Sequence, residues 1–396
     1  MSVASRPAAT AVVLALVALL FYGLGLARSP SALDSSEVTL ARQAYSIAQT
    51  GRDLDGRLFP LYIHGEGEVW FPPLPVYAAA AAAAIIPTSS VAVRWPSVVF
   101  GVIAVLLVYR LGLRLSSHVS VSLLAATFLL LSPAHYMFSR RGVEGIFAVP
   151  FVLGSVLCLL SFLEKKTPWS LSLAGLLLGI GFYSTTTAPL MMAIYLLLAV
   201  LTLWVSGLGQ PAHYARLVVG LLVPLLCLVP WFAWHPQSYP DTLGRWALHA
   251  AHIRNPMDGL RAIVNWGSLT NRASVYWEFL NPAFLFFPAD QPSASGTTAA
   301  GPLVFPLLVL VPVGIARVVR TSSREVATLL VVGLVVAPLA AATFGENHAI
   351  DRALVLLPFA AILGAFGVQS LWSSNRFGRI AAVLLVALAL IQARYL

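Results

Sequence analysis

The stretch "PPLPVYAAAAAAAIIP", residues 72–87, decides how the rest of this chain is arranged about a membrane. It is apolar and rich in alanine, but it is short and bounded by prolines, whereas a helix that crosses a bilayer needs roughly 20 apolar residues. If it crosses, every later loop changes side. Its role therefore has to be inferred from the charges that flank the other apolar segments.

The whole chain has the composition of an integral membrane protein. Of its 396 residues, 59% are hydrophobic and only 10% are charged. The net charge is +9, but the basic residues are dispersed among loops, which indicates membrane topology and no nucleic-acid partner. Cys158 and Cys227 both lie in apolar runs, so neither a disulfide framework nor a cysteine metal cluster is expected. Residues 8–27 are long enough for a full span, with no clear cleavage site after them, so no cleavable signal peptide is expected.

Eleven other segments have the composition of transmembrane helices. If residues 72–87 cross as well, Lys165, Lys166 and the arginines of residues 317–324 lie on the side opposite the N-terminus, against the tendency of basic loops to be cytoplasmic. If residues 72–87 are re-entrant or interfacial, the short basic loops all become cytoplasmic. We therefore predict eleven spans with the N-terminus inside: residues 8–27, 95–113, 117–133, 146–163, 169–183, 187–206, 215–234, 301–318, 325–343, 353–372 and 378–394.

This topology gathers the acidic residues on one side of the membrane. Of the fifteen Asp and Glu residues, all but Glu164 and Glu325 become external. No repeat or flexible linker divides the chain, so we expect a single all-α integral membrane domain over residues 1–396 with its site on the external side. The acids lie in a first external loop (28–94), a second loop (132–145), a long loop (235–300) and the segment 345–352.

The first external loop begins with a helix signal. Asp34 and Glu37 have the spacing of a capping box before an amphipathic run, which predicts a helix that starts here. The stretch "GRDLDGR", residues 51–57, places alternating charges between two glycines and predicts a tight, solvated turn after that helix.

Several stretches, taken in order, resemble the GT-C membrane glycosyltransferases. They are "LDSSEVTLARQAYSIAQTGRDLDGRLFPLY" (33–62), "PPLPVY" (72–77), "RWPSVVFGVIAVLLVYRLG" (94–112), "LLLSPAHYMFSRRGVEG" (129–145) and "GLLLGIGFYSTTTAPL" (175–190). Over most of residues 8–372 the chain is similar to bacterial relatives of the protein O-mannosyltransferases, the lipid A aminoarabinose transferase and the RgtA-like transferases. The resemblance implies an inverting hexosyl or pentosyl transferase that uses a polyprenyl-phosphate sugar donor.

The chain departs from this family at two positions. The resemblance implies an essential Asp in the first external loop and an acid in the second, and the related oligosaccharyltransferases also hold a divalent metal. Where the branch usually has Asp-Glu, this chain has Ser36 and Glu37, with Asp34 two residues earlier. Where the branch has Lys-Pro-Pro-Leu, Phe71 replaces the lysine. Either Asp34 takes over the missing carboxylate, or the chemistry is altered or lost.

Three carboxylates are the catalytic candidates: Asp34, Glu37 and Glu144. Glycosyl transfer needs a carboxylate that deprotonates the acceptor hydroxyl. The alternative for Asp34 and Glu37 is a purely capping role, and a helix N-terminus would keep either one ionised. The alternative for Glu144 is an ion pair with Arg140 at i, i+4 spacing.

The substrate-binding candidates are mainly cationic, because the leaving phosphate gains charge and arginine suits phosphate oxygens. Arg352 could instead pair with a neighbouring acid, and Glu68 is included because relatives hold an acid near its position. The predicted substrate-binding residues are Arg140, Arg141, Arg352, His348 and Glu68.

We therefore predict a glycosyltransferase of the cytoplasmic membrane that moves a sugar from a polyprenyl-phosphate donor to a lipid, glycan or protein acceptor on the external face, in contact with membrane lipids. A divalent metal is the one cofactor that the resemblance leaves open. The alternatives are a catalytically inactive GT-C-like subunit, and a transporter of lipid-linked sugars in envelope biogenesis. A transporter would place ionisable groups at mid-bilayer, whereas these spans are almost uncharged away from their ends.

Overall fold

All eleven predicted spans are helical in the computed structural model, which describes residues 5–29, 32–65, 70–86, 89–236, 266–287, 300–343 and 349–395. The all-helical, polytopic fold class is thereby confirmed. The helices that coincide with the spans are α1 (Ser5–Gly23), α4 (Ser90–Ser116), α5 (Val119–Leu130), α7 (Ala148–Lys165), α8 (Trp169–Gly181), α9 (Ala188–Val205), α10 (Pro211–Leu225) with α11 (Leu228–Trp234), α16 (Leu307–Thr321), α17 (Arg324–Val336) with α18 (Leu339–Thr343), α19 (Leu356–Ser373) and α20 (Arg376–Gln392).

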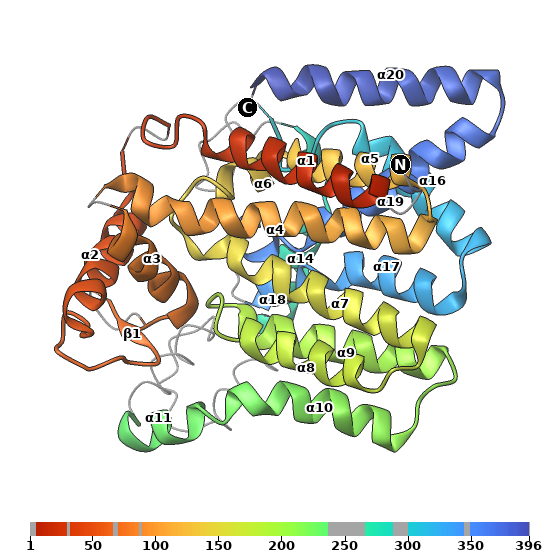
Figure 1. Cartoon of the computed structure of the whole chain (residues 1–396). Coiled ribbons are helices and arrows are strands. Elements are labelled where there is room, and N and C mark those ends of the chain that lie inside the picture. Colours follow the sequence, from red (N-terminus) through yellow and green to blue (C-terminus); the bar gives the residue numbers. More distant parts are fainter. Residues whose placement is uncertain are drawn as a thin grey trace.

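The helices form one bundle in which most axes run side by side (Figure 1). The N mark lies at one end of α1 and the C mark at the opposite end of the bundle, beyond α20, which fits an odd number of crossings. Within the described ranges, six segments are long and apolar enough to span a membrane by themselves: Ser90–Ser116, Glu144–Lys165, Ala188–Val205, Pro211–Trp234, Arg324–Thr343 and Leu356–Ser373.

The ambiguous stretch forms α3 (Pro73–Ile85), which lies outside the main bundle. Its 13 residues span about 20 Å at 1.5 Å per residue, well short of a bilayer core of about 30 Å. It packs against α2 (Ser35–Thr50) through a small apolar cluster that includes Leu40, Ile47, Val76 and Ala80. Figure 1 places α2 and α3 together beyond one end of α4. This arrangement agrees with a segment that does not cross.

The first loop is completed by two short strands, β1 (Ile63–His64) and β2 (Trp70–Phe71), which pair antiparallel and bring the chain back to the start of α3. Of the long loop 235–300, the structure describes α14 (Trp266–Phe279), α15 (Pro282–Phe286) and a few flanking residues. The second loop contributes α6 (Pro133–Phe138) and the 3-10 turn η1 (Glu144–Phe147), and a second turn, η2 (Ile350–Ala353), precedes α19.

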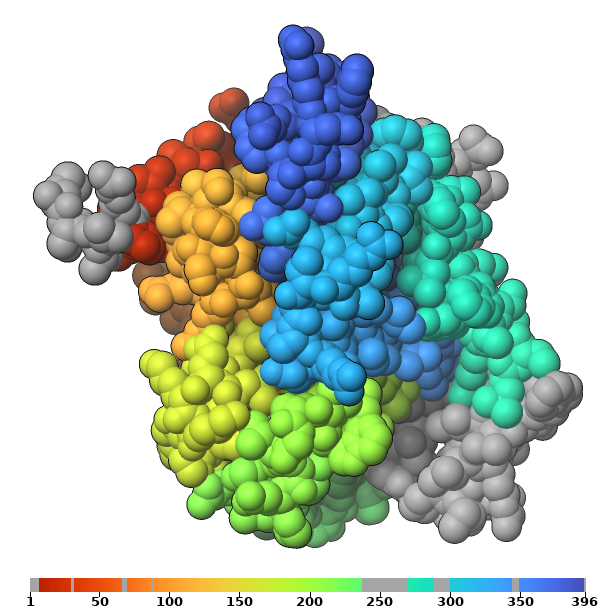
Figure 2. Space-filling model, turned by 90° about the vertical axis from the view of Figure 1, so that its right-hand side faces the viewer, coloured from red at the N-terminus to blue at the C-terminus, as the bar shows by residue number. Residues whose placement is uncertain are grey.

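Two helices at the edge of the bundle have large lipid-facing surfaces. In Figure 2, which looks onto the end of the bundle opposite the first loop, the C-terminal helix α20 projects from the top of the molecule. On the other edge, α10 meets α8 at glycines: a Cβ on Gly175 or Gly220 would collide with the carbonyl oxygen of the facing helix. Small residues let transmembrane helices approach this closely, which fixes α10 to the bundle while leaving its other face to lipid.

Candidate active site

The site is built around the first turn of α2. Asp34 is the N-cap: its Oδ1 accepts hydrogen bonds from the Glu37 backbone N–H (2.8 Å) and from the Ser36 hydroxyl (2.6 Å). The Glu37 carboxylate returns the bond by accepting from the Asp34 N–H at 3.2 Å. The predicted capping box is therefore present. It orients the side chains of Asp34, Ser36 and Glu37 at the end of the bundle.

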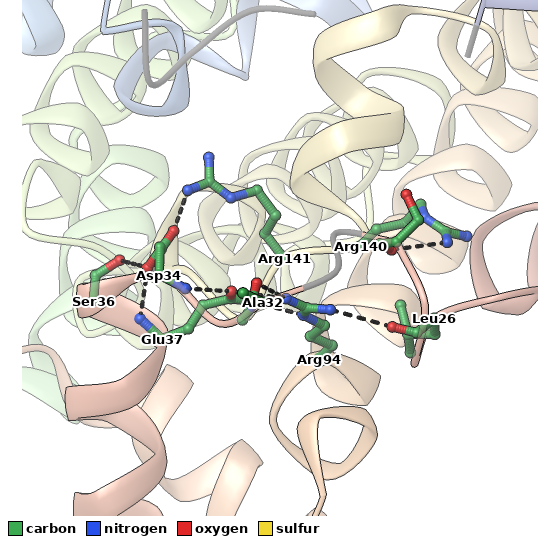
Figure 3. Close-up of polar contacts among 10 residues, drawn as sticks. Leu26, Ala32, Asp34, Ser36, Glu37, Arg94, Arg140 and Arg141 are labelled. Atoms are coloured by element: carbon green, nitrogen blue, oxygen red, sulfur yellow. Dashed lines mark hydrogen bonds and ion pairs between the residues drawn. The ribbon is translucent and has the colours of Figure 1, made fainter. Parts of the chain in front are cut away.

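Glu37 is buried in a network of structural contacts behind this turn (Figure 3). Arg94, at the start of α4, holds it with two charge-assisted bonds, from Nε to Oε1 at 2.8 Å and from NH2 to Oε2 at 3.0 Å. The backbone N–H of Gly142 in the second loop donates to the same Oε1 at 2.7 Å. Glu37 and Arg94 are each only 1% exposed. The pair joins the first loop, α4 and the second loop, and leaves Glu37 little freedom to act on a substrate.

Arg94 also connects this pair to the chain that leads out of α1. Its NH1 donates to the carbonyl of Leu26 and its NH2 to the carbonyl of Ala32, at 3.2 and 2.9 Å. Arg94 was not among the predicted site residues. A buried cation next to an apolar span is nonetheless a recognisable signal, because such a group is costly unless it has a partner.

Arg140 has a comparable structural role and does not reach the cavity. Its guanidinium donates to the carbonyls of Tyr22 (2.7 Å), Leu24 (2.8 Å) and Ser29 (3.0 Å) and lies over the ring of Tyr136. It thereby ties the end of α1 to the second loop. The alternative of an Arg140–Glu144 ion pair is not what the structure shows, and we assign Arg140 to holding the fold.

Arg141 points the other way and forms an ion pair with Oδ2 of Asp34 (Figure 3). Burial alone would raise the pKa of Asp34, but the hydrogen bonds from Ser36 and the Glu37 N–H, together with Arg141, outweigh it and lower the pKa below its ordinary value. Asp34 is thus held as a carboxylate at the margin of the site, and its low basicity makes it a weak proton acceptor.

A cavity of about 190 Å³ opens directly beside Ser36. Its polar lining comes from segments far apart in the sequence: Ser36 from the first loop, Glu144 from η1, Thr186 before α9 and Asp351 from η2. Apolar residues of the second strand and α3 close the other side. Their convergence in one small space is the feature that a site for chemistry requires. The remaining lining residues are Leu40, Phe71, Pro72, Pro75, Val76, Gly142 and Val143.

Glu144 is the central carboxylate of this cavity. Thr186 and Asp351 line the cavity beside it, and Asp351 and Arg352 lie near enough to act on its charge. Gly145 lets η1 and η2 come this close, because a Cβ there would lie 2.8 Å from the carbonyl oxygen of Asp351. Asp351 and Thr186 were not among the predicted site residues, although Thr186 lies in one of the family-like stretches.

The predicted site residues thus separate into groups. Asp34 and Arg141 form an ion pair at the margin, and Glu144 lines the cavity with Arg352 near it. Ser36 bonds to Asp34 and also lines the cavity. Glu37 and Arg140 are enclosed in contacts that hold the loops. Glu68 and His348, both predicted to bind substrate, lie outside the described residues.

The described residues around the cavity supply only part of the ligand set that a divalent metal needs. Within the described ranges, no three His, Cys, Asp or Glu side chains come close enough to hold a metal ion. Glu144 and Asp351 supply two carboxylates, the oxygen ligands that Mg²⁺ and Ca²⁺ prefer. Because that set is incomplete, we derive no step of a reaction through a metal.

Part of this site lies in a region of the chain that is similar to a known protein family. Residues 71–234 match the family model described as dolichyl-phosphate-mannose-protein mannosyltransferase. No curated protein matches the chain by sequence. The matched region runs from the end of β2 to the end of α11, so it includes Glu144 and Thr186 but neither Asp34 nor Asp351.

Solved structures match almost the whole chain. ArnT from Cupriavidus metallidurans bound to undecaprenyl phosphate is 13% identical with a TM-score of 0.57, over 98% of this chain and 70% of ArnT. The archaeal oligosaccharyltransferase AglB from Archaeoglobus fulgidus, in complex with an inhibitory peptide and a dolichol-phosphate, is 14% identical with a TM-score of 0.54. The chain has the GT-C glycosyltransferase fold.

The chain is shorter than the proteins it matches. It covers 63% of ArnT in its apo state, with 12% identity and a TM-score of 0.59, and 55% of AglB. The matches take in 97–98% of this chain, which is an integral membrane protein. The activity and substrates of the longer proteins do not transfer with the fold alone.

Proposed function

We propose that this GT-C chain is a glycosyltransferase that moves a sugar from a polyprenyl-phosphate donor to an acceptor hydroxyl, on the external face of the cytoplasmic membrane. The observation that carries the proposal is the cavity in which Ser36, Glu144 and Asp351 converge from three separate segments. Arg141 and Arg352 are the chain neighbours of the lining residues Gly142 and Asp351. The binding of undecaprenyl phosphate by a protein of the same fold supports a lipid-linked donor.

The residues present can carry out a single displacement. The Glu144 carboxylate takes the proton of the acceptor hydroxyl while the acceptor oxygen forms a bond to the anomeric carbon. The bond between that carbon and the phosphate oxygen breaks, and the electron pair leaves with the polyprenyl phosphate. Arg141 or Arg352 stabilises the charge that builds up on the phosphate. Attack from the side opposite the leaving group inverts the anomeric centre.

In this scheme Asp34 is a positioning residue. Its two oxygens already accept bonds from Ser36, Glu37 and Arg141, and its lowered pKa makes it a poorer base than an ordinary carboxylate. It holds the Ser36 hydroxyl and the Arg141 guanidinium at the edge of the cavity. The missing family carboxylate at position 36 is then compensated from the opposite wall, by Glu144 and Asp351.

The test is transfer by purified protein in proteoliposomes, with a panel of sugars on radiolabelled undecaprenyl phosphate and membranes that lack the chain as the acceptor source. We expect Glu144→Gln to lower transfer by about 10² or more, the usual worth of a general base, and Asp351→Asn to lower it less. Glu164→Gln is the matched control, because Glu164 lies in a partly exposed ion pair with Arg114, at the far end of the bundle. Unchanged transfer in Glu144→Gln would overturn the assignment of the base.

A second function is favoured by one observation, the serine at position 36. A GT-C chain that had lost catalysis would keep the lipid site and bind a polyprenyl-phosphate sugar without transferring it. The same proteoliposomes separate the two functions: binding of the labelled lipid with no transfer from any sugar of the panel would favour an inactive, lipid-binding subunit.

A further inference from the structure

A second, larger hollow lies on the other side of the first turns of α3. It is a groove of about 830 Å³ between the turn of the first loop, residues 52–61, and the outer end of the α10–α11 segment, residues 227–235. The two hollows are close neighbours, since Pro75 and Val76 line the cavity whereas Tyr77, the next residue, lines the groove. The Tyr77 hydroxyl donates to the carbonyl of Pro60 at 2.8 Å, which fixes the first loop against α3.

The groove combines an apolar wall with cations. Cys227, Pro230, Trp231 and Trp234 form the helical wall, and Leu61 faces it from the first loop. The basic side chains of the lining are Arg52, Arg57 and His235, and none of its described lining residues is an aspartate or a glutamate.

The two arginines differ in how many contacts their guanidinium groups already make within the protein. Arg57 forms an ion pair with Asp55 at 3.1 Å and lies over the ring of Trp70. Arg52 uses NH1 on the carbonyl of Gly56 at 2.7 Å and is otherwise exposed. An arginine fork with donors directed to a groove is suited to an anionic oxygen group.

The groove opens toward lipid. Trp234, on the α10–α11 segment that forms its wall, is 78% exposed, as befits an aromatic side chain at the boundary of the lipid. The facing turn presents Leu58 and Phe59 outward as well, and Phe59 does so from a strained backbone with φ of 43°. Apolar groups exposed on both rims mean that a ligand can enter from the bilayer.

From these features we propose that the groove binds a lipid-anchored acceptor that carries an anionic head group, such as a phosphate. The apolar wall covers the start of the lipid tail, Trp231 and Trp234 lie at the level of the head groups, and Arg52 and Arg57 contact the anion. Its role as the acceptor site rests on the proposed transfer reaction. Its ability to bind an anionic amphiphile does not.

Cys227 is a natural reporter, because it lines the groove and is exposed, while the other cysteine, Cys158, is half-buried. In a Cys158→Ser background, Cys227 is the one remaining thiol. We would follow its alkylation by N-ethylmaleimide in neutral phosphatidylcholine nanodiscs. The three probes are dodecyl phosphate, inorganic phosphate and uncharged dodecyl maltoside.

Dodecyl phosphate is expected to slow the alkylation of Cys227, because the thiol reacts only when the groove is empty. The effect should saturate with concentration, and at nine times the Kd of dodecyl phosphate the rate should fall by about tenfold. Inorganic phosphate and dodecyl maltoside should have little effect. Arg52→Gln should abolish most of the protection, whereas Arg28→Gln, an exposed external arginine outside the groove, should keep it.

Equal protection by dodecyl maltoside would overturn the anionic head group, and no protection by any amphiphile would overturn the site. Protection by inorganic phosphate alone would show a free-anion site in place of a lipid site. The result is independent of the transfer reaction, since Glu144→Gln should retain full protection. Absence of transfer by the wild-type protein with protection intact would therefore count against the proposed function and leave the groove as a lipid site.

Discussion

The two sides of the first turn of α2 differ in how completely other residues enclose their polar groups. On the buried side, Glu37 is enclosed by Arg94 and the Gly142 N–H, and its oxygens are occupied. On the cavity side, Ser36 faces Glu144 and Asp351 across open space. Similar residue types thus hold the fold on one side and line a cavity on the other. Whether a carboxylate can meet a ligand depends on whether the fold encloses it or leaves it at a cavity wall.

The largest effect is expected from breaking the buried side. Arg94→Met leaves the Glu37 charge buried without its partner, which typically costs about 3–5 kcal/mol of stability. Thermal unfolding in detergent would measure the loss, and Arg94→Met combined with Glu37→Gln should recover part of it because the stranded charge is removed.

Arg114→Met is the matched control for that substitution. Arg114 pairs with Glu164 at 3.6 Å, and both side chains are partly exposed. A pair of this kind contributes about 0–1 kcal/mol. An equal loss of stability in the two variants would contradict the distinction between a buried junction and an ordinary surface pair.

A smaller effect is expected at Asp34, where capping and charge can be separated. Asp34→Ala removes the N-cap and should cost about 1 kcal/mol of stability, whereas Asp34→Asn keeps a good cap and should cost much less. Both should reduce transfer, because neither holds Arg141 beside Ser36 by charge. Parallel unfolding and transfer measurements on the two variants test this. Full transfer by Asp34→Asn would show that the Asp34 charge has no positioning role.

The smallest expected effect is a dependence of stability on pH that is due to the Asp34 carboxylate. Its pKa in the folded protein lies below the ordinary value of 3.8, so its contribution to stability is present above about pH 4 and is lost as the pH falls through the lowered pKa. The difference in Tm between the wild type and Asp34→Asn should shrink as the pH is lowered from 6 to 3. A difference that stays constant or grows would mean that the carboxylate is not stabilised in the fold.

Much of the architecture could be predicted from local patterns. The apolar segments gave the spans, the charges in the loops favoured a non-crossing α3, and the spacing of Asp34 and Glu37 gave the start of α2. Each of these is decided by residues close together in the chain, or by a property summed over a whole segment.

The roles of single residues were harder to predict because they depend on distant partners. Glu37 was a candidate base, but Arg94, which encloses it, lies 57 residues further on. Arg140 and Arg141 are adjacent, and only the fold shows that one contacts carbonyls near α1 while the other meets Asp34. Asp351 was missed because its proximity to Glu144 follows from the packing of two short turns.

That packing gives Gly145 an influence out of proportion to its size. The glycine acts as the spacer between the wall that carries Glu144 and the wall that carries Asp351, since even a methyl group would press on the Asp351 backbone. A larger residue at position 145 would therefore have to move these two walls relative to each other, so a single substitution could reshape the cavity while every charged residue stays unchanged.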